Sequence, residues 1–174
     1  MRFANFDDAT FTRVFGEEGF DLIADYTNDI FLVGNEQAAQ MGLPPSFGAA
    51  VVHQQYPGAG APVPVLVVNV EACYDEMDFF TKLSPSKMTK KMRAMLVHER
   101  THLKQMEEGR LVNLCGVHYW EGQRVEISHG VTDEYFHTPW EIEAYVNQFM
   151  YQHDMTAEEA RVYLDDTVIS LKAA

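Results

Sequence analysis

MLVHERTHLKQ, residues 95–105, places two histidines four positions apart, with a glutamate directly after the first: His98, Glu99 and His102. On a helix, positions i and i+4 lie on one face, one turn apart, so His98 and His102 can direct their imidazoles at one metal ion. Glu99 lies where its carboxylate can reach a water molecule bound to that metal. The pattern indicates the minimal apparatus of a zinc hydrolase.

The residues on both sides of the motif predict one long helix over residues 87–108. Ser86 is a suitable N-cap, and Gly109 is a suitable C-terminal stop. The apolar residues 95–97 lead into the motif, as expected of a helix buried beside an active site. The alternative is that the two histidines are solvated or hydrogen-bonded residues of an ordinary amphipathic helix.

Length and composition limit the class of protein to which this chain can belong. The chain has 174 residues, of which 47% are apolar, so we expect a single domain, 1–174, with its own core. No apolar run approaches the ~18 residues of a membrane span, and acidic residues stand at the N-terminus where a signal peptide needs an apolar stretch. We therefore expect a cytoplasmic protein without a membrane partner. Cys73 and Cys115 are predicted to be reduced thiols, not a disulfide and not metal ligands.

The charge of the chain argues against one class of partner. The net charge is −13, from 26 acidic and 13 basic residues, whereas a nucleic-acid partner requires a clustered basic face. The one basic cluster consists of Lys87, Lys90, Lys91 and Arg93, and we interpret it as the solvated face of the long helix. We expect no nucleic acid as a partner.

The remaining pattern predicts an α+β domain, with a sheet packed against helices. The first thirty-odd residues suggest one helix and one strand. The apolar run 65–70 predicts a buried or edge strand. Two further strands are expected at 111–120 and 123–128, joined by a hairpin-like turn at Glu121-Gly122.

A third metal ligand is needed, because a catalytic zinc site uses three protein ligands and leaves the fourth position to water. Thr138 can cap a second helix with Pro139 at its first position, which places Glu141 and Glu143 near its start. Either carboxylate would serve. Thr138 and Glu141 also fit a capping box, and Glu143 also fits an exposed acid near the positive end of a helix.

Three segments together resemble a known family. They are VHERTHLKQMEEG (97–109), the Trp120-Glu121-Gly122 turn and PWEIEAY (139–145). The combination is similar to the gluzincin branch of the zincin metallopeptidases, and to the small minimal forms that phages and bacteria encode. The resemblance covers residues 92–145, about a third of the chain.

The resemblance implies a minimal zincin-like domain, in which a small mixed sheet packs on the active-site helix and a second helix carries a ligand. Residues 1–60 would be a divergent N-terminal part, and 87–152 the metal-site core. The setting would be the bacterial cytoplasm or a phage-infected host cell.

The resemblance also implies a role for each site residue. His98, His102 and Glu141 would hold one Zn²⁺ per chain, with Ala144 as the small residue that lets the second helix approach. Glu99 would be the general base of a metallopeptidase that acts on a protein or peptide substrate. A further donor to the oxyanion could come from the segment before the second helix, which contains His129, Tyr135 and His137.

The substrate-binding features are less determined. By analogy with zincins, the strand at 65–70 is the candidate edge to which a substrate strand could add. Tyr119-Trp120 could line a specificity pocket, although packing over the sheet explains the pair as well. The C-terminal helix from Thr156 to Leu164 opens with a capping box, and it could dock a partner or close the domain's own core.

The alternative function is a catalytically idle zincin-like binding protein, or a virion assembly component, with a structural zinc site.

Overall fold

The computed structural model describes residues 2–25, 29–44, 47–58, 60, 62–114, 117–127 and 133–170. The chain divides into two compact units, residues 1–99 and residues 100–174. Both contain helices and strands, so the α+β prediction is confirmed. No helix within the described ranges is long and apolar enough to cross a membrane.

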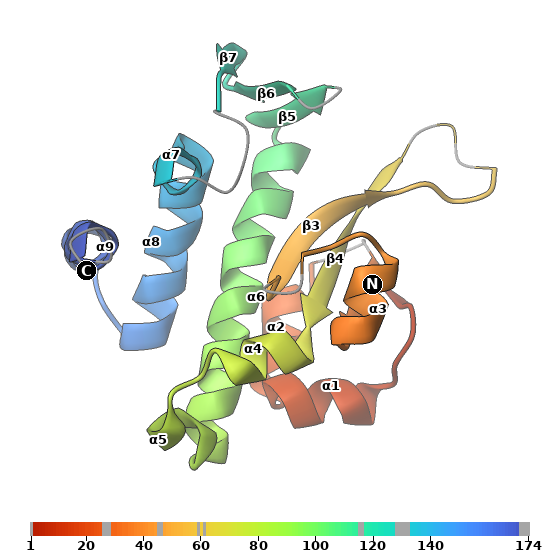
Figure 1. Ribbon diagram of the computed structural model, residues 1–174, viewed down its shortest axis with the longest axis vertical. Coiled ribbons are helices and arrows are strands. Elements are labelled where there is room, and N and C mark those ends of the chain that lie inside the picture. Colours follow the sequence, from red (N-terminus) through yellow and green to blue (C-terminus); the bar gives the residue numbers. More distant parts are fainter. Residues whose placement is uncertain are drawn as a thin grey trace. The chain divides into compact units, whose positions relative to one another are not determined.

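The first unit is built on a four-stranded mixed sheet in the order β1-β2-β4-β3, of which β3 and β4 are labelled in Figure 1. Its strands β1, β2 and β4 are parallel, whereas β3 runs antiparallel to β4. The bounds are β1 Arg2–Phe3, β2 Asp29–Val33, β3 Ala49–Gln54 and β4 Val63–Asn69.

Strand β4 lies inside the sheet. It pairs with β2 on one side, where Leu66 aligns with Ile30, and with β3 on the other, where it aligns with Val51. Residues 65–69 are all buried, as expected of an apolar run covered on both faces. The prediction that this strand offers a free edge to a substrate is therefore wrong, because both of its edges are already paired.

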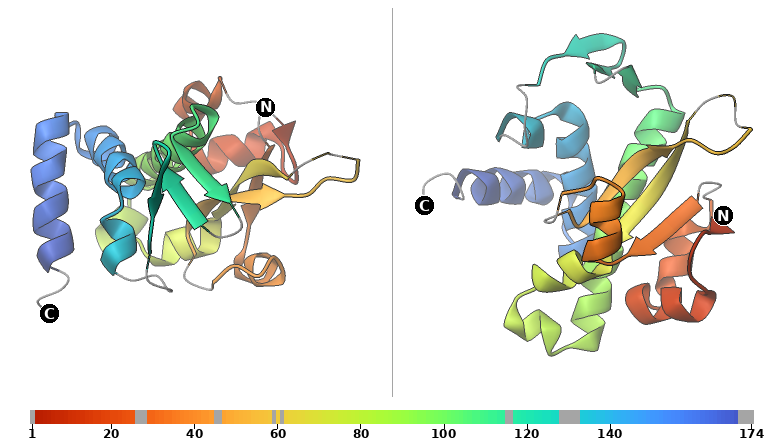
Figure 2. Two further views of the ribbon diagram at one scale, coloured as in Figure 1. Left: turned by 90° about the horizontal axis from the view of Figure 1, so that it is seen from above. Right: turned by 45° about the vertical axis from the view of Figure 1, so that its right-hand side comes forward.

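Short helices connect these strands. The predicted single helix and strand in the first thirty-odd residues are wrong: β1, two helices and β2 occupy this segment, and the chain bends between the helices at Gly16 (Figure 2). Three of the helices have an N-cap residue whose side chain accepts a backbone N–H. These N-cap residues are Asp7, Asn69 and Asp78. The bounds are α1 Asp8–Phe15, α2 Glu18–Ile23, α3 Asn35–Gln40, α4 Val70–Asp75 and α5 Phe79–Lys82.

The predicted long helix is α6, Pro85–Glu107. It begins two residues earlier than expected, since the Met88 N–H donates to the Ser84 carbonyl over 2.9 Å. Proline suits the first helical position, where its missing N–H is not needed. At the other end, Gly109 has φ 69° and the Arg110 N–H donates to the Gln105 carbonyl over 2.9 Å, which is a glycine-terminated helix end as predicted.

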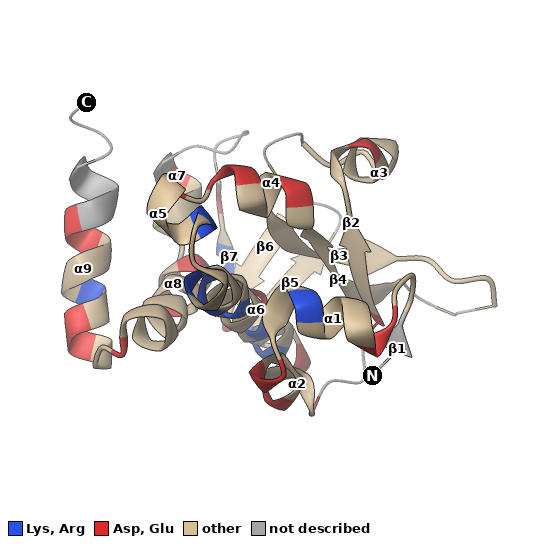
Figure 3. Cartoon of the chain, turned by 90° about the horizontal axis from the view of Figure 1, so that it is seen from below, with Lys and Arg blue, Asp and Glu red and all other residues tan. Residues whose placement is uncertain are grey.

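Lysine and arginine residues follow one another along α6 (Figure 3), but the basic cluster is only partly a solvated face. Lys87 is exposed. Arg93 instead donates to the Phe15 carbonyl over 3.0 Å and forms an ion pair of 2.7 Å with Glu18, so its part of the prediction is wrong. An arginine side chain can reach across its own unit in this way because its apolar stem packs while its guanidinium bonds.

The structure describes one of the two cysteines. Cys73 is a free, buried thiol, as predicted, and burial raises its pKa to about 12. Cys115 lies outside the described residues.

The second unit holds a three-stranded antiparallel sheet, β5-β6-β7. The predicted strand 111–120 is in fact two strands, β5 Leu111–Leu114 and β6 Val117–Trp120, which pair with each other. The turn at Glu121-Gly122 is confirmed: both residues have positive φ, 49° and 80°, as a two-residue hairpin turn requires. It leads into β7 Gln123–Val125, so the last predicted strand ends before 128, which lies outside the described residues.

The helices of the second unit follow the sheet, and α9 packs on α8 (Figure 2). Val146 of α8 forms one buried cluster with Ala160 and Leu164 of α9. The predicted capping box of α9 is present: Thr156 N–H donates to Glu159 Oε2 over 2.8 Å, and Glu159 N–H donates to Thr156 Oγ1 over 3.3 Å. The C-terminal helix thus closes the core of its own unit. The bounds are α7 Asp133–Phe136, α8 Pro139–His153 and α9 Ala157–Ser170.

Candidate metal centre

His98, His102 and Glu141 form a buried group that is close enough to bind a metal ion. Each offers one ligand atom, and these atoms all lie within 4.8 Å of one another. Two members lie one turn apart on the continuous helix α6, and the third lies in the first turn of α8. In the part of the chain that the structure describes, no other such group of three is found.

The contact between the two helices brings the ligands of the second unit together. His102 Nε2 lies 3.2 Å from Glu141 Oε1. Glu141 is 2% exposed and His102 is 7% exposed, and a carboxylate buried to this degree is costly unless it is paired or binds a cation. The chemistry of the donor set, two imidazoles and one carboxylate, suits divalent metal ions including zinc.

The capping-box interpretation of Glu141 is wrong. Thr138 is the N-cap of α8, but its side chain makes no capping hydrogen bond. Its hydroxyl donates to the Tyr135 carbonyl over 2.8 Å, and its N–H donates to the same carbonyl over 3.1 Å. The N–H that a capping-box glutamate would accept is thus already bonded, which leaves the Glu141 carboxylate to face His102.

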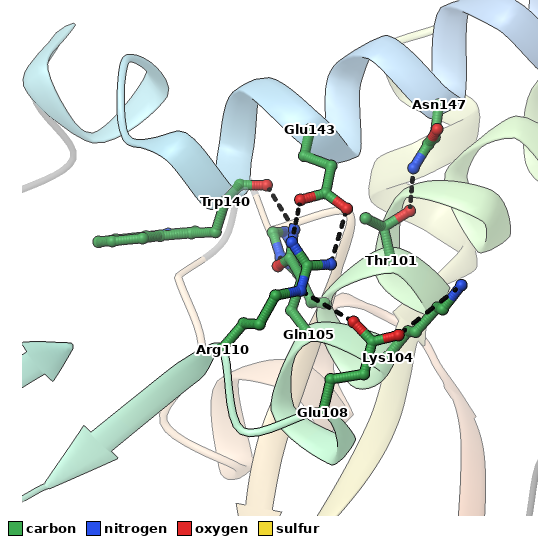
Figure 4. Close-up of polar contacts among 9 residues, drawn as sticks. Thr101, Lys104, Gln105, Glu108, Arg110, Trp140, Glu143 and Asn147 are labelled. Atoms are coloured by element: carbon green, nitrogen blue, oxygen red, sulfur yellow. Dashed lines mark hydrogen bonds and ion pairs between the residues drawn. The ribbon is translucent and has the colours of Figure 1, made fainter. Parts of the chain in front are cut away.

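Glu143 faces a different partner. The Arg110 guanidinium donates to both of its carboxylate oxygens, over 2.7 and 2.8 Å (Figure 4). These hydrogen bonds hold the pKa of Glu143 below its usual range and raise the pKa of Arg110. Arg110 also donates to Glu108 over 2.8 Å. Glu143 is therefore engaged in an ion-pair network and lies outside the metal group.

Glu99 follows His98 directly and belongs to the same helical turn. It is 6% exposed, so its carboxylate is withdrawn from bulk water. Buried carboxylates beside a potential metal site are where proton-transfer roles are found. A proton-transfer role for Glu99 stays a prediction from its position next to the first histidine.

Gln105 contacts the group, a role that was not predicted from the sequence. It is fully buried. Its Oε1 lies 3.0 Å from His102 Nδ1, and its Nε2 donates to the Trp140 carbonyl over 3.1 Å. The signal was present in the sequence, because position 105 is three residues after His102 and i, i+3 side chains meet on a helix.

The helices α6 and α8 are joined on both sides of Glu141 and Ala144. Besides the bond from Gln105 to Trp140, the Asn147 amide donates to the Thr101 hydroxyl over 3.1 Å (Figure 4). Ala144 lies between these two bonds and is fully buried. A small residue at this position is what a close approach of two helices requires.

The metal group does not include His137, one of the remaining candidates. Tyr135 is part of α7, where its carbonyl accepts from Thr138, and His137 is exposed. His129 lies outside the described residues. Trp120 packs with its ring 6.3 Å from that of Trp140 and carries the Arg110 guanidinium 5.1 Å from its centre, which supports packing as its role.

Comparison of the chain with protein-family models, with curated protein sequences and with solved structures gives no match. The structure itself shows a buried group of two histidines and one glutamate that can bind a metal ion, and a second buried glutamate, Glu99, next to His98 in the chain.

Proposed function

We propose that this chain is a zinc-dependent metallopeptidase of the gluzincin type. The observation that carries the proposal is the buried group of His98, His102 and Glu141, whose ligand atoms lie within 4.8 Å of one another. Three protein ligands of this kind leave a coordination position for water, which distinguishes a catalytic zinc site from a structural one closed by four ligands.

In this proposal each residue has one task. His98, His102 and Glu141 hold the zinc ion, which when bound acidifies a water molecule and polarises the substrate carbonyl. Glu99 accepts the proton of the attacking water and delivers it to the leaving amine, so one carboxylate serves as base and then as acid. The Arg110–Glu143 ion pair takes no part in this chemistry, because Glu143 lies outside the metal group.

The ligand assignment is tested by metal content. Full-length wild type and the variants Glu141→Ala and Glu143→Ala are incubated with zinc, desalted and measured by elemental mass spectrometry. We expect one zinc per chain in wild type and in Glu143→Ala, and loss of the metal in Glu141→Ala. The two glutamates lie on the same helical turn, so each is the control for the other. A wild type that retains no zinc after incubation contradicts the proposal.

The catalytic assignment is tested with Glu99→Gln, a change that keeps the size of the side chain and removes its basicity. A peptide library is incubated with zinc-loaded wild type and variant, and the products are read by mass spectrometry. We expect cleavage by wild type and a loss of at least 100-fold in the variant, within the range of general-base contributions. Both proteins should contain equal zinc. Retained cleavage in Glu99→Gln would exclude this base, and no cleavage by zinc-loaded wild type would favour the idle binding protein.

A further inference from the structure

We propose that Gln105 is a positioning residue of the metal group. It fixes the tautomer of His102 so that the Nε2 lone pair points at the metal position, and with the same amide it holds the first turn of α8, which carries Glu141. The metal-binding part of this inference rests on the proposed function, whereas the tautomer can be tested on the metal-free protein.

The hydrogen-bond chemistry of an amide determines which atom of Gln105 faces which partner. The Trp140 carbonyl can only accept, so the Gln105 atom 3.1 Å from it is the donor Nε2. That orientation leaves the carbonyl oxygen Oε1 facing His102 Nδ1 at 3.0 Å. Because Oε1 can only accept, Nδ1 of His102 carries the hydrogen.

The hydrogen on Nδ1 also determines what the other ring nitrogen of His102, Nε2, can do. With its hydrogen on Nδ1, neutral His102 presents a bare lone pair at Nε2, and this atom lies 3.2 Å from Glu141 Oε1. A nitrogen lone pair and a carboxylate oxygen at this separation repel each other unless a proton on Nε2 or a metal ion lies between them. Gln105 thereby sets His102 in the form that a metal ion needs, since ligating histidines use one nitrogen for the metal and donate from the other.

The bond to Trp140 adds a second constraint. Trp140 lies next to Glu141 in the first turn of α8. Within a helix, the carbonyl at position 140 also accepts from the N–H four residues later, so the backbone does not need Gln105 to satisfy it. The bond instead ties the ligand-bearing turn to His102 through a single fully buried side chain. One residue thus couples the placement of the two ligands.

The experiment compares wild type with Gln105→Glu and Gln105→Met in the full-length protein. Glutamate keeps an acceptor for Nδ1, whereas methionine has a similar size and no comparable acceptor. Long-range ¹⁵N–¹H NMR of the imidazoles, recorded over a pH series, reports which ring nitrogen carries the hydrogen once the ring is neutral. The His102 signals are identified by their absence in His102→Gln. The metal-free protein is measured first, and then the protein with Zn²⁺ alone.

We expect the Nδ1–H tautomer in wild type and in Gln105→Glu, and its loss in Gln105→Met. The zinc dissociation constant should rise roughly 10- to 100-fold in Gln105→Met, the usual effect of losing a residue that orients a ligand, and less in Gln105→Glu. The exposed residue Gln123 supplies the control: Gln123→Met should leave both readouts unchanged. Urea unfolding of each variant verifies that it is folded.

The proposal is overturned if Gln105→Met keeps the Nδ1–H tautomer, or if it keeps both folding and wild-type zinc affinity. Should Gln105→Met fail to fold, Gln105→Glu decides, because loss of the tautomer there overturns the proposal and retention supports it. If wild type binds no zinc, the proposed function fails while the tautomer of the metal-free protein still tests the role of Gln105. The two failures are thereby distinguishable.

Discussion

The two halves of helix α6 bury different chemistry. In the first half the buried residues are apolar: Met92, Ala94 and Leu96. From His98 to Gln105, every buried residue except Leu103 carries a polar side chain. The first half resembles any helix that packs on a core, where other apolar residues of similar volume would serve. The second half cannot be exchanged so simply, because a buried polar group must keep its partners.

The difference shows which half of α6 contains the candidate metal group. The polar half is joined to α8 by specific contacts: His102 with Glu141, Gln105 with Trp140, and Thr101 with Asn147. Removing one member leaves its buried partner unsatisfied, which costs more than the bond contributes. A protein that needed only a stable helix pair would achieve it with apolar side chains. The polar contacts hold the helices on which the candidate metal group lies, and the proposed function depends on that group.

The largest effect is expected in the apolar half. Leu96 is 2% exposed, so Leu96→Ala removes buried methyl groups and leaves a cavity, which should lower the free energy of unfolding by about 2–5 kcal/mol. The control is Leu83→Ala, at a leucine that is 65% exposed, and it should change this free energy by less than about 0.5 kcal/mol. Urea unfolding measures both. Equal losses in the two variants would contradict the assignment of Leu96 to the core.

The second-largest expected effect is stabilisation of the fold by zinc, which should depend on the polar half of α6 and not on the apolar half. Zinc at about 100 times its dissociation constant should raise the free energy of unfolding by ~2.7 kcal/mol, because only the folded chain assembles the group. This gain should persist in Leu96→Ala, which leaves the ligands in place. It should disappear in Glu141→Gln and remain in Glu143→Gln. Urea unfolding with zinc and with a chelator measures it, and a full zinc effect in Glu141→Gln would exclude Glu141 as a ligand.

Local features of the sequence predicted much of this arrangement. The i, i+4 spacing predicted that His98 and His102 share a face of the helix, and Gly109 predicted the end of α6. Thr138 and Pro139 predicted the start of α8. Each of these depends on residues within a few positions of one another, where propensity and periodicity carry information.

Some of the open choices and errors concern contacts between distant residues. The sequence alone could not separate Glu141 from Glu143, because the choice depends on Arg110, which lies 33 positions from Glu143. It also offered β4 as a possible edge, since an apolar run has the same composition whether one or both of its neighbours are strands. Such choices are made by tertiary contacts, which leave little trace in a local pattern.

The smallest effect concerns a polar contact that is not buried. In the capping box of α9, hydrogen bonds from Thr156 hold the pKa of Glu159 below its usual value. A carboxyl whose pKa is lower in the folded chain stabilises it above the unfolded pKa, and this contribution is lost as the pH falls through the folded pKa. Glu159→Gln should therefore melt below wild type at pH 7, and the difference should vanish in acid.

The neighbouring Glu158 is the matched control. It is exposed in the same first turn of α9 and is equally close to the positive end of the helix. Glu158→Gln should lower the melting temperature less than Glu159→Gln, because it removes a charge but no capping bond. Thermal melts followed by circular dichroism from pH 7 to pH 3 compare the two. If both variants lose the same stability at every pH, the helix dipole accounts for the effect and the capping box contributes nothing. If Glu159→Gln alone shows the pH-dependent loss, an exposed polar contact contributes to stability through its hydrogen bonds.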